Sequence, residues 1–366
     1  MKLLKLFKNK AVLAVAARGV GFLASFVLSY AIAKNFDLSD AGSFLWAMAI
    51  VTALTTVSSL GTGQHLVRAA ASEKDMTQES FDMFSLSFFG VVITFIFFFV
   101  SCFFWGGDNR ELLLYLAPSL FLIGVASSLS YIIQGLGYVK SSLLFLTTFT
   151  PAFLSLYIFY NDNILDVALA RSAISLLLLV TVFFVIYFIL KVRLRFDFRN
   201  LLSTFSRARS LFMVAISLMI ISWGGQVVSG FYLSSEDLAR LSITQKVSMA
   251  LGAVLIGVNA YISPKFAREY RASGVSERLR NLYAKTVFSS TIPAVVMFFL
   301  LIYYGDDLLS YIGAGYSGYS GLLLIFLVGQ LVNACTGSAQ NLLNMSGNDN
   351  LYKNSVFVAT VVFFIL

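Results

Sequence analysis

Long apolar blocks, separated by short polar segments, make up most of this chain. Eleven blocks approach the ~20 residues that a helix needs to cross a bilayer. We place these spans at 12–33, 43–63, 83–105, 112–134, 142–160, 167–190, 210–232, 241–263, 286–304, 319–341 and 355–366. The pattern predicts an all-α polytopic membrane protein. Because the eleventh block stops after twelve residues at Leu366, we expect the chain to be a fragment or the product of a shortened reading frame.

Composition and charge agree with this fold class. Of the 366 residues, 58% are hydrophobic and 12% are charged, which is about half the charged share of a soluble domain. This excludes a soluble enzyme and a nucleic-acid-binding domain. The net charge of +8 reflects topology, because the N-terminus and the loops after even-numbered spans carry 20 of the 26 Lys and Arg residues, and three lie on the opposite side. The positive-inside rule therefore predicts a cytoplasmic N-terminus.

Three cations remain inside the predicted spans: Arg18, Arg171 and Lys246. All 18 acidic residues fall in loops or near the ends of spans. A charged side chain within a bilayer usually faces a cavity and marks a pathway, so these cations are candidates for binding an anionic substrate. The alternative is snorkelling of long side chains toward the interface, since Arg171 and Lys246 are predicted only four or five residues from the outer ends of their spans.

Neutral polar residues in the spans are weaker candidates for lining the same cavity. They are Gln134, Gln226, Gln245 and Asn259. The alternative for each is a hydrogen bond that joins neighbouring helices. The two cysteines, Cys102 and Cys335, fall inside apolar blocks, and we expect both to be small core side chains without a disulfide or metal role.

No motif in the chain supports enzymatic chemistry. The stretch from Gly313 to Gly318 matches G-x-G-x-x-G, but it lacks the preceding strand and the downstream acid of a dinucleotide site, so we predict a flexible external loop. His65 is the only histidine, which excludes a multi-histidine metal site. We therefore expect no catalytic residue, no cofactor and no metal.

The two halves of the chain carry weakly similar segments in the same order. The matching pairs are Leu38–Gly42 with Ser235–Ala239, and Gln134–Gly137 with Asn344–Gly347. The offset is six spans, and an even number of spans makes the repeat parallel. We therefore predict two lobes of six transmembrane helices around a central cavity. Residues 1–200 form the N-terminal lobe, and residues 201–366 form a C-terminal lobe that is incomplete and ends within its fifth helix.

Several further segments keep a recognisable order and spacing along the chain. They are Ala31–Phe44, Leu60–Arg68, Ile133–Gly137, Ser263–Phe266, Ile312–Tyr316 and Leu342–Gly347. With these segments the chain resembles the polysaccharide flippases, the O-antigen-type transporters of the multidrug/oligosaccharidyl-lipid/polysaccharide exporter superfamily. The resemblance implies alternating access around a cationic lumen, in which Arg18, Arg171 and Lys246 would hold pyrophosphate or an acidic sugar.

The resemblance also implies a substrate and a location. The substrate is a polyprenyl-pyrophosphate-linked oligosaccharide, such as an O-antigen or other surface polysaccharide repeat unit. It moves from the inner to the outer leaflet of the bacterial cytoplasmic (inner) membrane. Expected partners are this substrate, membrane lipids, and polysaccharide polymerase and other assembly proteins, without nucleic acid. We expect a monomer.

The chain departs from the family pattern at two places. Phe36-Asp37 stand where the family usually has Leu-Gly, and Gly225-Gln226 stand where many members place an acid in the seventh span. Three alternatives therefore stay open. The first is a multidrug or cation antiporter of the same superfamily, which would need an acidic lumen residue. The others are a membrane enzyme, such as a polymerase or glycosyltransferase, and an inactive truncated remnant.

Overall fold

The computed structural model describes residues 2–72, 78–105, 107–346 and 349–365, and the regular structure in these ranges is helical throughout. Its α-helices are α1 (Lys2–Asn35), α2 (Leu38–Ser58), α3 (Thr62–Ser72), α4 (Gln78–Trp105), α5 (Arg110–Gly135), α6 (Val139–Leu143), α7 (Phe149–Ile158), α8 (Ile164–Phe184), α9 (Leu201–Met219), α10 (Gly225–Ser229), α11 (Ser235–Ser273), α12 (Glu277–Ile312), α13 (Ser320–Cys335), α14 (Ala339–Met345) and α15 (Asp349–Ile365). Short 3-10 and π segments are η1 (Gly107–Asn109), η2 (Leu144–Thr148), η3 (Val185–Ile189), η4 (Ile220–Gly224) and η5 (Ala314–Tyr316). The predicted all-α membrane fold is confirmed. Gly347 and Leu366, on which sequence predictions rested, lie outside the described residues.

Helices occupy all eleven predicted positions. Within the described part of the chain, nine helical segments are long and apolar enough to cross a membrane. The helices α11 and α15, which coincide with the predicted eighth and eleventh spans, are not among these nine. The membrane-spanning role of these two helices therefore stays a prediction.

Two helices begin earlier than their apolar blocks, because capping side chains start them. The side chain of Asn163 accepts a hydrogen bond from the backbone nitrogen of Leu165 at 2.9 Å, at the start of α8. Ser234 caps α11 in the same way. Arg171 and Lys246 consequently lie seven and eleven residues into their helices, or roughly 10 and 16 Å. Their depth from the outer face of the membrane stays a prediction.

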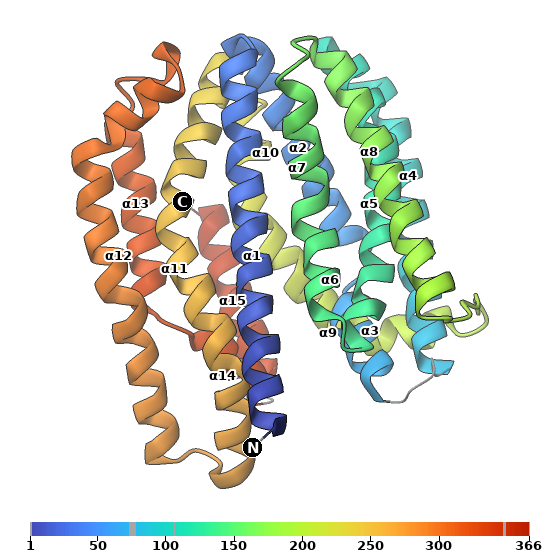
Figure 1. Ribbon diagram of the computed structural model, residues 1–366. Helices are drawn as coiled ribbons and strands as arrows, with labels where there is room; N and C mark the ends of the chain where they lie inside the picture. Colours follow the sequence, from blue (N-terminus) through green and yellow to red (C-terminus); the bar gives the residue numbers. More distant parts are fainter. Residues whose placement is uncertain (1, 73–77, 106, 347–348, 366) are drawn as a thin grey trace.

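The helices form two groups with α1 between them (Figure 1). In one group α3, α4, α5, α7 and α8 pack on one another, and in the other α11, α12 and α13 do so. We call the end that carries the N-terminus the proximal end, and the end where α1 stops and α11 starts the distal end. The groups diverge toward the proximal end (Figure 1). A boundary between lobes at residue 200 stays a prediction.

At the distal end, α2 packs closely against the second group. The hydroxyl of Ser43 lies 3.1 Å from the hydroxyl of Ser235, at the start of α11. The indole nitrogen of Trp46 donates to the carbonyl oxygen of Val227, also at 3.1 Å. A Cβ at Gly42 would collide with the Ser235 carbonyl oxygen. Small side chains thus let the two groups approach at backbone distance.

The glycine-rich loop between α12 and α13 is part of the same distal contact. Arg240 donates from Nε to the carbonyl oxygen of Gly315 at 3.1 Å, and its guanidinium lies 5.3 Å from the ring centre of Tyr319. Tyr316 is buried in the core, and this burial raises the pKa of its phenol to about 12. The loop predicted to be flexible thus anchors one side chain in the core, and its external location stays a prediction.

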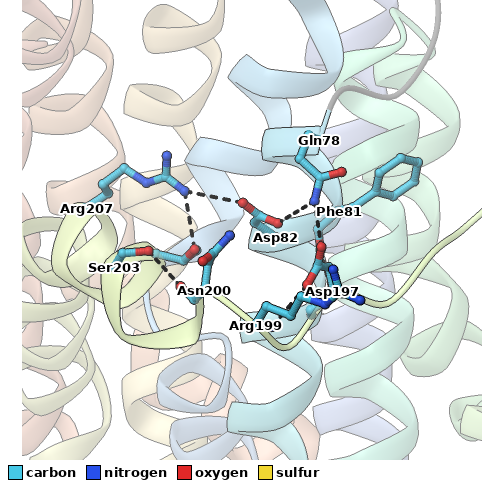
Figure 2. Close-up of polar contacts among 10 residues, drawn as sticks. Gln78, Phe81, Asp82, Asp197, Arg199, Asn200, Ser203 and Arg207 are labelled. Carbon is cyan, nitrogen blue, oxygen red and sulfur yellow. Dashed lines mark hydrogen bonds and ion pairs between the residues drawn. The ribbon is translucent and has the colours of Figure 1, made fainter.

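At the proximal end, polar contacts tie α9 to α4 (Figure 2). Arg207 of α9 lies 3.6 Å from Asp82 of α4. Gln78 donates from Nε2 to Asp82 and to Asp197, each at 2.9 Å. Asp197 belongs to residues 190–200, which we call the joining segment, because they connect η3 to α9. Asp82 lies near the start of α4, in agreement with its predicted place at the end of a span, and its side chain is only 9% exposed.

The two cysteines differ in their surroundings. Cys102 of α4 is buried in the main hydrophobic core, as expected. Cys335, at the end of α13, is exposed, so the expectation that it is a core side chain is wrong. The apolar sequence around Cys335 reveals that the helix is membrane-like, but not which of its faces meets another helix.

Candidate functional site

A central cavity of about 70 Å³ lies where the two groups meet. Its walls come from α1, α2 and α11, and from the continuous η4–α10 helix. This volume admits only a few water molecules, at roughly 10–15 Å³ of such volume for each. The polar residues in its lining are Ser25, Ser29, Thr52, Gln226, Ser242, Gln245 and Lys246. No acidic side chain belongs to the described lining.

Lys246 supplies the single charge in this lining. It lies on the same face of α11 as Ser242, one turn away, and next to Gln245. Lys246 is half-buried, and no ion pair to it exists among the described residues. An ammonium group in this position favours an anionic or hydroxyl-bearing ligand, because it can only donate hydrogen bonds.

Gln226 lines the cavity, but its amide nitrogen is already committed. Nε2 donates to the hydroxyl of Ser242 at 2.7 Å and more weakly to the carbonyl oxygen of Leu45 at 3.3 Å. These contacts join α10 to α11 and to α2. Gln226 therefore holds α10 in place against α11 and α2. This agrees with the alternative given above, in which its side chain joins neighbouring helices.

Arg18 lies outside the described lining. It is exposed and stands seven residues before Ser25, which lines the cavity. Seven residues are nearly two full turns, so Arg18 and Ser25 share one face of α1, about 10 Å apart along the axis. Arg18 therefore marks the same face on the proximal side of the cavity.

Arg171 lies away from the cavity, inside the first helix group. Only 5% of the residue is exposed, and its Nε has no hydrogen-bond partner. The neighbouring Ser172 donates its hydroxyl to the carbonyl oxygen of Tyr115 at 2.7 Å, which places this part of α8 against α5. Arg171 is thus buried among protein side chains and does not belong to the lining that contains Lys246.

Gln134 and Asn259 also lie elsewhere. Gln134 is at the proximal end of α5, where Gly135 packs on the backbone of Val67. The side-chain oxygen of Asn259 accepts a hydrogen bond of 2.5 Å from Ser338, which joins α11 to the turn before α14. The seven predicted site residues thus separate into three that line the cavity, namely Gln226, Gln245 and Lys246, and four that do not.

The prediction from sequence missed Trp223 and four hydroxyl residues of the lining, Ser25, Ser29, Thr52 and Ser242. Serine and threonine are common in membrane helices, so the sequence offered no signal to select these four. Trp223 did carry a signal, because it stands three residues before Gln226 and therefore on the same helix face.

Solved structures share this fold over nearly the whole chain. The MATE multidrug transporter DinF-BH, solved as a complex, aligns with a TM-score of 0.68 at 16% identity, covering 99% of this chain and 87% of that one. An outward-facing multidrug resistance MATE family transporter of the MOP superfamily gives 0.66 at 12% identity, covering 96% and 83%. An inward-facing MATE family transporter gives 0.62 at 13% identity, covering 96% and 86%. These likenesses establish the fold.

Sequence comparisons add the family. A search among curated proteins found no significant match. The sequence model described as "Polysaccharide biosynthesis protein" matches residues 6–268, which is well over half of the chain. The chain therefore belongs to the polysaccharide biosynthesis protein family.

Proposed function

We propose that the protein moves a polyprenyl-pyrophosphate-linked oligosaccharide from the inner to the outer leaflet of the bacterial cytoplasmic membrane. The observation that carries the proposal is the central cavity, in whose described lining Lys246 is the one charged side chain. Pyrophosphate and acidic sugars are anions, and a lysine ammonium binds them by charge-assisted hydrogen bonds. The protein acts as a transporter, with no catalytic residue.

Arg18 extends the cationic path toward the proximal end. It shares the α1 face of Ser25, and it is exposed about 10 Å nearer to the proximal end of the helix. The positive-inside pattern assigns the proximal end to the cytoplasm. A lipid-linked anion that enters from the inner leaflet would then meet Arg18 before it reaches Lys246.

Alternating access follows from the unequal closure of the two ends. Contacts such as Ser43 with Ser235 hold the distal end closed, whereas the helix groups diverge at the proximal end. With the predicted orientation this is an inward-facing state. Release to the outer leaflet requires the distal contacts to separate, with the predicted lobes 1–200 and 201–366 as the parts that move.

A multidrug antiporter is the second candidate function. Its support is the fold shared with MATE transporters, among them a MATE multidrug transporter. The cavity argues for the flippase, because a lone lysine repels cationic compounds. Hypersensitivity of a deletion strain to cationic dyes, with normal polysaccharide export, would favour the antiporter.

The deciding experiment measures the sidedness of lipid-linked oligosaccharide in a strain that lacks this gene, with and without the chain restored. We expect the substrate to accumulate on the cytoplasmic leaflet, and the restored chain to relieve the accumulation. Normal sidedness in the deletion strain, with no redundant transporter, would refute the flippase.

Substitution of Lys246 tests the role of the cavity charge. Lys246→Gln should lower export about 10- to 100-fold, which corresponds to the loss of one charged hydrogen bond, and Lys246→Arg should retain most of it. Lys34→Gln is the matched control, because Lys34 is an exposed lysine at the end of α1. Wild-type export by Lys246→Gln, at equal membrane abundance, would remove this role.

A further inference from the structure

Trp223 is the aromatic side chain of the central cavity. It lies on the π-helical segment η4 and is half-buried. Trp46 has a different environment, because its indole nitrogen donates to Val227 and its ring packs edge-on against Phe231, with centres 5.9 Å apart. No hydrogen bond of the Trp223 indole exists within the described part of the chain. Trp46 thus serves helix packing, whereas Trp223 borders the cavity without a polar partner.

The position of Trp223 is defined by its helix. Gln226 lies one turn further along the same face, and its hydrogen bonds to Ser242 and Leu45 hold that face toward α11 and α2. π-Helical segments are rare and often occur at functional sites. The hydrogen bonds of Gln226 therefore fix the helix face that carries Trp223 against the cavity.

The facing walls offer hydrogen-bond acceptors. Ser29 donates its proton to the carbonyl oxygen of Ser25 at 3.1 Å, and Thr52 donates to Met48 at 2.7 Å. With their protons committed to the backbone, the hydroxyl oxygens of Ser29 and Thr52 act as acceptors. Lys246 adds donors and a positive charge. The cavity thus combines an aromatic face, hydroxyl acceptors and one cation.

This combination matches the chemistry of a sugar ring that bears or adjoins an anion. A pyranose has hydroxyl donors around its rim, and its C–H groups form an apolar face that carries partial positive charge. The face of an aromatic ring is its negative side. A flat organic cation could also stack on an indole, but Lys246 would repel it.

We propose that Trp223 determines specificity by stacking its indole on a pyranose ring of the transported glycan, while Lys246 binds the adjoining anionic group. The inference rests on the proposed flippase function. It adds that the central cavity binds the glycan as well as the lipid anchor. At about 70 Å³ the cavity is too small for a pyranose. Stacking therefore requires the two helix groups to separate around the cavity, so that the cavity becomes large enough for a sugar ring.

The test compares two probes on the purified full chain in lipid nanodiscs. One is undecaprenyl pyrophosphate that carries a single N-acetylglucosamine, and the other is undecaprenyl pyrophosphate without sugar. Wild type and Trp223→Phe should bind the glycosylated lipid about three- to tenfold more tightly than the bare lipid, the range expected for one aromatic stacking contact. Trp223→Leu should bind the two lipids equally, and its unchanged affinity for the bare lipid shows that it is folded.

Each other outcome refutes a defined part of the argument. If the Trp223→Leu variant still binds the glycosylated lipid more tightly than the bare lipid, Trp223 does not recognise the sugar, and the flippase proposal stands. If wild type binds both lipids equally, no sugar stacks in the cavity, and recognition lies in the pyrophosphate lipid. If wild type binds neither lipid, the proposed flippase function fails, and the inference fails with it.

Discussion

Lys246 and Arg171 are both cations within helices of this protein, yet their surroundings differ. A charge in the middle of a bilayer costs at least ~2.5–3.5 kcal/mol, so it persists only where a cavity or a partner reduces the cost. Lys246 has a polar cavity beside it. Arg171 is buried against α5, and its Nε has no partner. At the scale of the residue, Lys246 can therefore bind an anionic ligand in the cavity, whereas Arg171 lies outside the described lining of that cavity.

Gly42 provides a test of the distal contact at the scale of one residue. Gly42→Ala should force α2 away from Ser235, because the added Cβ meets a backbone oxygen that cannot rotate aside. We expect a cysteine introduced at Ser43 to react severalfold faster with a maleimide in this variant. The background carries Cys102→Ala and Cys335→Ala, which removes both natural cysteines.

Gly19→Ala is the control for that substitution. A Cβ at Gly19 in α1 meets nothing within 4 Å, so the labelling rate should not change. Equal rates in the Gly42→Ala and Gly19→Ala variants would contradict the close distal packing.

At the scale of the element, α9 belongs by sequence to the second half of the chain but is fastened to the first. The joining segment places Phe196 against Phe84 and Phe88, with ring centres 5.3 and 5.1 Å apart. The Asp82–Arg207 ion pair adds a polar contact beside it. The joining segment therefore packs along α4, like a strap between the two halves of the chain. This packing restricts how the proximal half of α9 can move.

Charge exchange at the Asp82–Arg207 pair tests this strap (Figure 2). Asp82→Arg should lower the melting temperature by a few degrees, because it places two cations together where a carboxylate held Arg207 and Gln78. Adding Arg207→Asp should recover part of the loss. Arg207 is half exposed, so solvent screening limits the recovery to about 1 kcal/mol.

Asp108→Arg is the matched control for the strap, since Asp108 is exposed at η1. It should leave the melting temperature within about a degree of wild type. A double variant at 82 and 207 that is no more stable than the Asp82→Arg single variant would show that the ion pair contributes nothing.

At the scale of the whole molecule, the helix groups are closed at one end and diverge at the other, which under the proposed function is an inward-facing state. The distal contacts join residues about 190 positions apart, as in Ser43 with Ser235. They therefore connect the two halves of the chain directly. Under the proposed function, a cycle of alternating access has to break these contacts and remake them.

A disulfide across the distal end should arrest this cycle. In the background without natural cysteines, Ser43→Cys with Ser235→Cys should cross-link under mild oxidation, since the two hydroxyls lie 3.1 Å apart. We expect export to fall to the background level and to recover when the disulfide is reduced. Export at the wild-type rate by fully cross-linked protein would rule out distal opening.

The control cross-link lies within one helix group. The hydroxyls of Ser87 and Ser128 are 2.6 Å apart between α4 and α5. A disulfide at these positions should leave export largely intact, because alternating access does not require α4 and α5 to separate. Loss of export in both cross-linked proteins would point to general rigidity and not to the distal contact.

The helices themselves were predictable from sequence because a bilayer imposes one requirement on every span. Backbone groups in lipid have to be satisfied within the segment, so a long apolar block becomes a helix. The exact starts were less predictable, since capping by Asn163 and Ser234 depends on single side chains outside the apolar blocks. The earlier start of α11 places Lys246 eleven residues into that helix.

The sequence by itself determined the all-helical membrane fold, the membership of the polysaccharide biosynthesis family and the presence of three cations without acidic partners inside the spans. Only the tertiary structure decided which polar residues meet. Helical periodicity shows which residues share a face, but it does not specify the face opposite. Lys246, Gln245 and Trp223 come together in one cavity, and Arg171 is left out of it, because the packing of α11 and η4 against α1 and α2 joins positions far apart in the chain.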